Sequence, residues 1–336
     1  MTNPVLVNRW RGGSVEGRHR GFVAVCNAAG EEILTIGDID RIHFPRSAIK
    51  FIQAIPLVES GAIEHFGLDS RHIALACASH NGEYIHTNLV INWLESIKLE
   101  ESDLECGAEL PLYPEARFEL VRSGKAPRRY HHNCSGKHTG ILTTIKYLGE
   151  QTTDYRLFHH PSQQRWVSVL RELSATDISS LPYGYDGCAM PALAMPGRML
   201  ATVMARFGNP VGLTQQRKYA MQSILQAVTD EPYLVAGADR LCSALMSETG
   251  RPVLVKTGAD GCYVAILTHQ GYGISLKIDD GNKEAAEVLL GAVLKHLQAI
   301  TNEQYDSLGD YFKPDITNSR GDVVGHFEIA GESGLT

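Results

Sequence analysis

The chain has 336 residues, about twice the usual length of one domain. Hydrophobic residues make up 43% and charged residues 21%, which is typical of a folded globular protein. A formal net charge of −7, without a long basic run, argues against nucleic acid as a partner. No apolar run approaches the roughly 18 residues that span a bilayer, and residues 1–11 lack the apolar core of a secretory signal. We therefore expect a cytoplasmic protein that does not contact a membrane.

Short β-branched and apolar runs lie near both ends of the chain. Residues 21–26 and 32–36 are separated by a turn sequence and predict an antiparallel hairpin. Three more strands are predicted over residues 252–256, 262–267 and 273–278. Helix-like apolar spacing occupies the middle and the end of the chain, over residues 84–98, 163–173, 191–207, 214–228 and 283–300.

This order of elements predicts an α+β fold rather than a doubly wound parallel sheet. We expect a single unit over residues 1–336, in which an antiparallel sheet is built from residues of about 1–45 and 250–336. The mostly helical segment over about 46–249 would form a second lobe of the same unit.

A serine and a lysine open the first helical pattern of the middle segment. Ser47 and Lys50 are three residues apart and share a helix face, so the amine can reach the hydroxyl. A serine at a helix N-terminus also gains from exposed N–H groups that stabilise a developing anion. Taken alone, however, Ser-x-x-Lys arises by chance about once in a chain of this size, and surface helices are rich in lysine.

Two further patterns, each present once, change this interpretation. Ser79-His-Asn follows an apolar run, and Lys256-Thr-Gly ends a predicted strand. Singly they are also explained by a turn serine and a solvent-facing strand end. In this order the three patterns resemble the set found in serine β-lactamases and penicillin-binding proteins. In such a site a lysine takes the serine proton, and the N–H groups of Ser47 and Ala259 would form the oxyanion hole.

The seven cysteines are an odd number with irregular spacing, so we expect thiols rather than a disulfide framework. Cys134 and Cys188 lie in glycine-containing turns beside other polar side chains, where a metal could bind. Their separation of some 54 residues does not match the close pairs of usual zinc motifs, so the spacing favours two partly buried free cysteines over a metal site. The nearby histidines are either ligands or hydrogen-bonding groups, and these are His131, His132 and His138.

Five segments together resemble the Rhizobium etli-type (class 3) L-asparaginases. They are Phe44-Pro-Arg-Ser-Ala-Ile-Lys50, Ser79-His-Asn-Gly-Glu83, His132-Asn-Cys-Ser-Gly-Lys-His138, Asp186-Gly-Cys188 and Lys256-Thr-Gly258. The resemblance runs from about Val5 to Glu328 and implies a serine β-lactamase-like fold, a homodimer and hydrolysis of L-asparagine to L-aspartate and ammonia.

The resemblance also implies roles for individual residues. The catalytic pairs would be Ser47 with Lys50 and Ser79 with Lys256. A zinc ion would be held by Cys134, Lys137 and Cys188, with Asp186 close by. Only a neutral amine can bind zinc, and the charge of the ion would favour that form of Lys137.

The sequence also leaves two other functions open. One is another serine hydrolase of the same fold: a glutaminase, a β-lactamase or a D-Ala carboxypeptidase. Another is a non-catalytic zinc-binding or sensor protein. Candidates for reading the α-ammonium and α-carboxylate of a substrate flank the motifs, and these are Arg46, His80, Glu83 and Asp186.

Overall fold

The computed structural model describes residues 2–335, which divide into two compact units. The sheet unit contains residues 2–48, 194–209 and 248–335, and the helical unit contains residues 49–193 and 210–247. Among residues 2–335, no helix is both long and apolar enough to cross a membrane.

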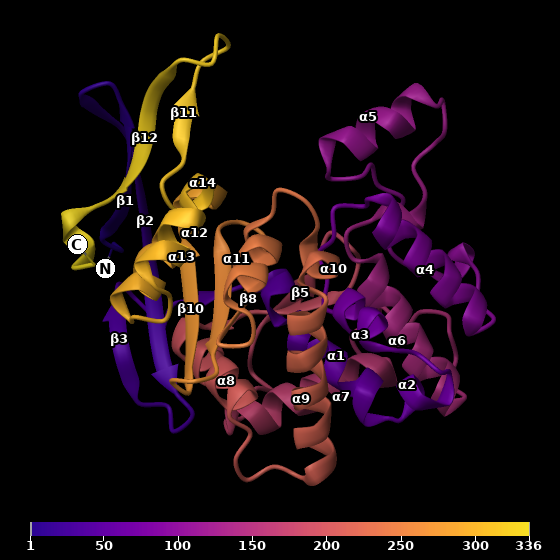
Figure 1. Cartoon of the computed structure of the whole chain (residues 1–336). Helices are drawn as coiled ribbons and strands as arrows, with labels where there is room; N and C mark the ends of the chain where they lie inside the picture. Colours follow the sequence, from indigo (N-terminus) through magenta and orange to yellow (C-terminus); the bar gives the residue numbers. More distant parts are fainter. Residues whose placement is uncertain (1, 336) are drawn as a thin grey trace. The chain divides into compact units, whose positions relative to one another are not determined.

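The sheet unit is built around one antiparallel sheet of eight strands (Figure 1). Its order is β11 (Asp315–Thr317), β12 (Val323–Ile329), β1 (Val5–Arg11), β2 (Ser14–Asn27), β10 (Tyr272–Ile278), β9 (Cys262–Leu267) and β8 (Val253–Thr257), with β3 (Glu32–Ile36) also paired to β2. The predicted hairpin and the three predicted strands are therefore confirmed, as is the α+β class with a sheet from both chain ends. Strands β1, β11 and β12 were not predicted.

Helices cover both faces of this sheet. On one face, Gly273 lies under α8 (Gly197–Gly208), where an added Cβ would be 2.1 Å from the carbonyl oxygen of Ala201. On the other face, the Tyr263 hydroxyl donates to Glu287 of α12 (Lys283–His296) over 2.7 Å. Residues that alternate along each strand thus contact different helices.

The predicted helix over residues 191–207 is wrong in its first part. Residues Pro191–Leu193 form β6 and Met195–Pro196 form β7, which pairs with β4 (Ile42–His43), and helix α8 begins only after them. One apolar run covers both a short buried strand and the helix after it, so apolar spacing alone does not separate the two. Pro196, the residue before α8, has an extended backbone with ψ of 146°, so the helix cannot begin earlier. The sequence placed this segment with the helical lobe, whereas α8 packs on the sheet and belongs to the sheet unit.

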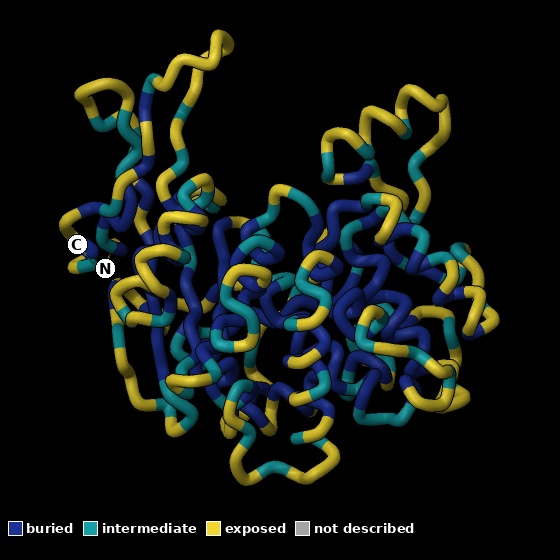
Figure 2. Tube along the Cα trace, viewed as in Figure 1, coloured by how far each residue is buried: buried dark blue, intermediate teal, exposed yellow. Residues whose placement is uncertain are grey.

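The helical unit packs around α1 (Lys50–Glu59), in which eight of ten residues are buried. Figure 2 shows the buried residues of each unit in dark blue. Helices α3 (Ser70–Ala76), α6 (Ser135–Leu148), α7 (Pro161–Ser174) and α9 (Gln215–Asp230) contact α1, and α4 (Tyr84–Ser96) packs on α6.

The predicted helices over 84–98, 163–173 and 214–228 are confirmed as α4, α7 and α9. The predicted terminal helix is α12, which ends at His296. The remaining elements are short: α2 (Ala62–His65), α5 (Pro114–Arg122), α10 (Pro232–Ala236), α11 (Leu241–Thr249), α13 (Asn302–Ser307), α14 (Gly309–Phe312) and β5 (Tyr183–Tyr185).

Candidate active site

A buried lysine contacts one of the candidate serines. Lys50 is the first residue of α1, and its Nζ donates to Ser79 Oγ over 3.1 Å and to the carbonyl oxygen of Ala78. Its side chain has no exposure to solvent. Burial lowers the pKa of Lys50 below its ordinary value. A lysine that releases its proton more readily can take the proton of a neighbouring serine hydroxyl.

The two cysteines and two lysines named from the sequence form one buried cluster in the helical unit. Lys50 Nζ is 3.1 Å from Cys134 Sγ, and Lys137 Nζ is 3.2 Å from Cys188 Sγ. Cys134 and Cys188 are themselves hydrogen-bonded to each other. Cys134, Lys137 and Cys188 are at most 5% exposed. Together with the fully buried Lys50, all four side chains are shielded from water.

Local structure presents the thiols and Lys137 toward one another. Cys134 is the residue before α6 and Lys137 lies in the first turn of that helix, and residues three apart share a helix face. Cys188 lies in the turn of the β5–β6 hairpin. That turn is closed by a 2.8 Å hydrogen bond from the Ala189 N–H to the Asp186 carbonyl, and Ala189 has a positive φ of 64°.

The protonation of the cluster is set by its internal hydrogen bonds. The pKa of Cys134 lies well below its ordinary value because Cys188 donates to its sulfur and two ammonium groups are near. The pKa of Cys188 is raised because its proton serves that hydrogen bond and because it is buried. Cys134 is therefore the thiolate of the pair.

The donor set is compatible with the zinc ion that the resemblance implies. Two thiol sulfurs and one amine converge in a buried position, and thiolates with a nitrogen donor are ligands that zinc accepts. In the described part of the chain, no three His, Cys, Asp or Glu side chains gather as metal ligands. The cluster reaches three donors only when Lys137 is counted.

The sheet unit brings the other two motifs together. Arg46 pairs with Asp260 over 3.1 Å, and an added Cβ on Gly258 would be 2.3 Å from the Pro45 carbonyl oxygen. The Lys-Thr-Gly segment therefore needs a glycine where the Ser47 segment passes over it. Ser47 and Lys256 both belong to this unit, whereas Lys50 and Ser79 belong to the helical unit. The pairings Ser47–Lys50 and Ser79–Lys256 stay predictions.

The backbone before Ser47 is in an unusual conformation. Arg46 has φ of 54°, a left-handed value that a side chain with a Cβ disfavours. Residues Arg46–Ile49 form a 3-10 turn and the α-helix begins at Lys50, so Ser47 is not in the first turn of an α-helix as the sequence indicated. Held backbone strain of this kind is frequent at functional sites.

Two candidate substrate-reading residues are engaged inside the helical unit. His80 is fully buried, and its Nε2 lies 2.9 Å from Ser135 Oγ. Glu83 accepts from the Tyr233 hydroxyl and from the Ala238 N–H, at 2.5 and 3.0 Å. The Asp186 backbone closes the Cys188 turn, and Ala259 follows Gly258 in the sheet unit. Their roles toward a substrate stay predictions.

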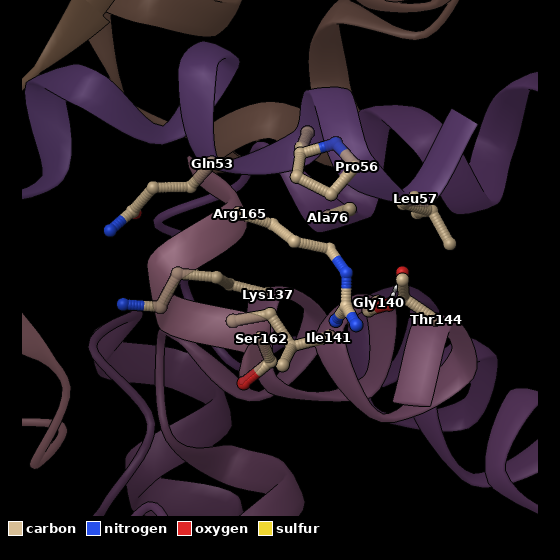
Figure 3. Close-up of a pocket in the computed structure, with 11 residues that line it drawn as sticks. Gln53, Pro56, Leu57, Ala76, Lys137, Gly140, Ile141, Thr144, Ser162 and Arg165 are labelled. Carbon is tan, nitrogen blue, oxygen red and sulfur yellow. Dashed lines mark hydrogen bonds between the residues drawn. The ribbon is translucent and has the colours of Figure 1, made fainter. Parts of the chain in front are cut away.

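Reasoning from sequence missed Arg240, which donates to the Ser79 carbonyl and to Asn81. No pattern in the sequence marks it, because it lies 161 residues from Ser79. A pocket lies between α1, α6 and α7, with Gln53, Gly140 and Arg165 on its wall (Figure 3). Lys137 is the one residue of the cluster that lines this pocket.

The L-asparaginase II family model matches residues 7–329. The chain therefore belongs to the L-asparaginase II family, which supports an amidohydrolase activity on a small-molecule substrate. No curated protein matches this sequence.

Several solved structures are similar to this chain. A β-lactamase from Mycobacterium bovis is 13% identical, with a TM-score of 0.43, over 87% of this chain and 94% of its own. A D-alanine carboxypeptidase from Burkholderia cenocepacia is 11% identical, with a TM-score of 0.36, over 81% and 93%. A Bacillus glutaminase is 13% identical, with a TM-score of 0.36, over 83% and 91%. Nothing about the substrate follows from similarities this low.

The buried ring of His86 makes a prediction about acid stability. It stacks on His80 with centroids 5.0 Å apart, and burial lowers its pKa from 6.5 to about 4. Glu83 opposes this shift and Arg240 adds to it. Above pH 6.5 the ring is neutral in both states and has no effect. Between pH 6.5 and about 4 only the unfolded chain binds this proton, so the free energy of unfolding falls as the pH falls.

In His86→Phe this contribution is absent, because phenylalanine keeps a stacking ring but has no proton to bind. The pH dependence between 6.5 and 4 should then be weaker by about 3 kcal/mol in total, measured by urea unfolding at several pH values. Replacing the exposed His65 by Phe is the matched control and should keep the wild-type slope. An unchanged slope in His86→Phe would contradict the prediction.

Proposed function

We propose that this chain is an L-asparaginase of the Rhizobium etli-type (class 3), which hydrolyses L-asparagine to L-aspartate and ammonia. The observation that carries the proposal is the hydrogen bond between Lys50 Nζ and Ser79 Oγ, in a chain of the L-asparaginase II family. A serine next to a lysine of lowered pKa is the arrangement that amide hydrolysis requires, since the hydroxyl must lose its proton to attack.

The proposed reaction has two stages. A serine oxygen attacks the side-chain amide carbon of asparagine while its proton passes to a lysine amine. The proton then goes to the departing nitrogen, ammonia leaves, and water hydrolyses the resulting ester to give aspartate. We assign Ser47 with Lys50 and Ser79 with Lys256 as the two pairs, with Ser47 as the nucleophile. The contact of Lys50 with Ser79 supports the alternative in which Ser79 attacks.

Around this reaction we propose further features from the motifs and the resemblance. The N–H groups of Ser47 and Ala259 would bind the oxyanion. The α-ammonium and α-carboxylate groups of the substrate would be bound by residues among Arg46, His80, Glu83 and Asp186. The protein would act as a homodimer in the cytoplasm. Light scattering would then give about twice the chain mass of 36.8 kDa, and a monomer mass would reject the dimer.

Cys134, Lys137 and Cys188 would hold a zinc ion, which as a Lewis acid would fix a polar group of the substrate. Lys137 must be neutral to serve as a ligand. In the cluster without metal, burial lowers the pKa of Lys137, but the neighbouring cysteine sulfurs outweigh it and the net shift is upward. Metal binding therefore releases a proton from the amine, and zinc affinity should fall as the pH falls. A serine and a lysine already supply a nucleophile, so we assign this site to placement of the substrate.

The first prediction concerns the substrate. Ammonia release from L-asparagine should be much faster than from L-glutamine, and continuous ammonia detection measures both. The two amides differ by one methylene, which an apolar pocket discriminates by roughly 1–3 kcal/mol, so a slow glutaminase activity is expected. Equal rates, or a faster reaction with glutamine, would reject the assignment.

The second prediction concerns the serines and lysines. Ser47→Ala, Lys50→Met, Ser79→Ala and Lys256→Met should each lower kcat by about 10²-fold or more while the proteins stay folded. A Ser47→Ala/Lys50→Met double variant should be little worse than either single one, because the two groups act as a unit. The surface variant Lys146→Ala should keep wild-type kcat. Strictly additive losses would argue against a shared proton path, and a covalent adduct trapped on Ser79 would reverse the choice of nucleophile.

The third prediction concerns the metal. Purified wild type should contain one zinc per chain by elemental analysis, and Cys134→Ser should lose it. If zinc places the substrate, this variant has a raised KM and a measurable kcat, whereas a zinc-activated nucleophile requires near-total loss of kcat. Cys26→Ser removes a buried thiol outside the cluster and should keep the metal. Absence of zinc from carefully prepared wild type would reject the site.

A further inference from the structure

The main chain of Ser79 is held by a segment that is remote in sequence. Its N–H donates to the Val235 carbonyl over 2.9 Å, and its carbonyl accepts from Arg240 Nη1 over 3.3 Å. Val235 is in the short helix α10, and Arg240 follows four residues after that helix. Ser79 itself lies beyond the end of α3, where no helix or strand fixes the backbone. Both backbone polar groups of Ser79 are therefore bonded to this segment.

Asn81 is fixed by the same segment at both ends of its side-chain amide. Its Nδ2 donates to the Ala238 carbonyl over 2.7 Å, and its Oδ1 accepts from Arg240 Nη1 over 2.9 Å. The guanidinium of Arg240 thus bridges the Ser79 carbonyl and the Asn81 amide. A planar, always charged donor is well suited to hold two acceptors in fixed directions.

The segment that carries Arg240 is itself held in a strained shape. Gly237 has φ of 105°, and an added Cβ there would be 2.1 Å from Glu83 Oε1. Asp239 has φ of 54°, although it has a side chain. The Ala238 N–H between them donates to Glu83 Oε1 over 3.0 Å. A backbone in this conformation persists only where surrounding bonds maintain it. It places the next residue, Arg240, where its guanidinium contacts the Ser79 carbonyl.

We propose that Arg240 is a positioning residue for Ser79. It contacts the backbone of the serine rather than its hydroxyl, and it acts by holding Ser79 Oγ at hydrogen-bond distance from Lys50. This inference rests on the proposed function to the extent that Ser79 takes part in catalysis. Misplacing a reacting group by about 1 Å can cost about 10²-fold in rate, so loss of the bridge should affect the chemical step more than substrate binding.

The kinetic test compares three variants of the full chain with wild type. Arg240→Ala should lower kcat about tenfold or more and change KM less than about threefold, and Arg240→Lys, which keeps a donor, should recover part of kcat. Arg217→Ala is the matched control, since Arg217 pairs with Glu59 and Glu172 in the same unit and is similarly shielded from solvent. It should keep wild-type kcat with L-asparagine.

Three kinetic outcomes would overturn the proposal. Unchanged kcat in Arg240→Ala would show that the bridge is not needed, and a raised KM with unchanged kcat would show that Arg240 binds substrate. An equal loss of kcat in Arg217→Ala would show a general effect of removing a partly buried arginine from this unit.

A second measurement does not depend on activity. Amide hydrogen exchange should accelerate in the peptide covering residues 78–83 of Arg240→Ala and Arg240→Lys, more in the first, and stay at the wild-type rate in Arg217→Ala. Unchanged exchange in that peptide would overturn the proposal. If wild type releases no ammonia from asparagine, the proposed function fails, and hydrogen exchange alone then decides whether Arg240 holds Ser79.

Discussion

The helical unit depends on how it accommodates the buried amine of Lys50. Removing an ammonium group from water costs several kcal/mol unless other groups replace the lost hydration. Here a carbonyl oxygen, the Ser79 hydroxyl and the Cys134 sulfur surround the amine. The pKa of Lys50 is lowered while that of Lys137 is raised, and Cys134 rather than Cys188 is the thiolate. Of the two buried amines, Lys50 therefore gives up its proton more readily than Lys137.

Close helix packing makes this cluster possible. Helix α6 approaches the end of α3 so closely that an added Cβ on Gly136 would be 2.3 Å from the Leu75 carbonyl oxygen. This approach brings Cys134, just before α6, beside the residues that follow α3. Lys50 reaches the same place because α1 is buried along nearly all its length and begins with the lysine. A larger residue at position 136 would separate the thiol from the amine.

Sequence patterns predicted those parts of the molecule that depend on local order. Alternating apolar runs predicted the central strands, and regular spacing predicted α4, α7 and α9. Strand β1 was missed because its outer half carries polar and basic side chains. The contact of Lys137 with Cys188 was beyond such reasoning, since the two are 51 residues apart and meet only through packing. Family resemblance, not spacing, nominated the lysine as a metal ligand.

The Ser79-His-Asn motif shows why a pattern does not assign one role to all its residues. The Ser79 hydroxyl contacts Lys50, as chemistry requires, whereas both ends of the Asn81 amide bind the segment that includes Ala238 and Arg240. Gly82 has φ of 75°, a left-handed value that suits a glycine in a tight turn. The motif thus combines a reactive group with the residues that fix its backbone. Because a hydroxyl can exchange a proton with a lysine only when its direction is fixed, the residues that hold the Ser79 backbone matter to the site as much as the hydroxyl itself.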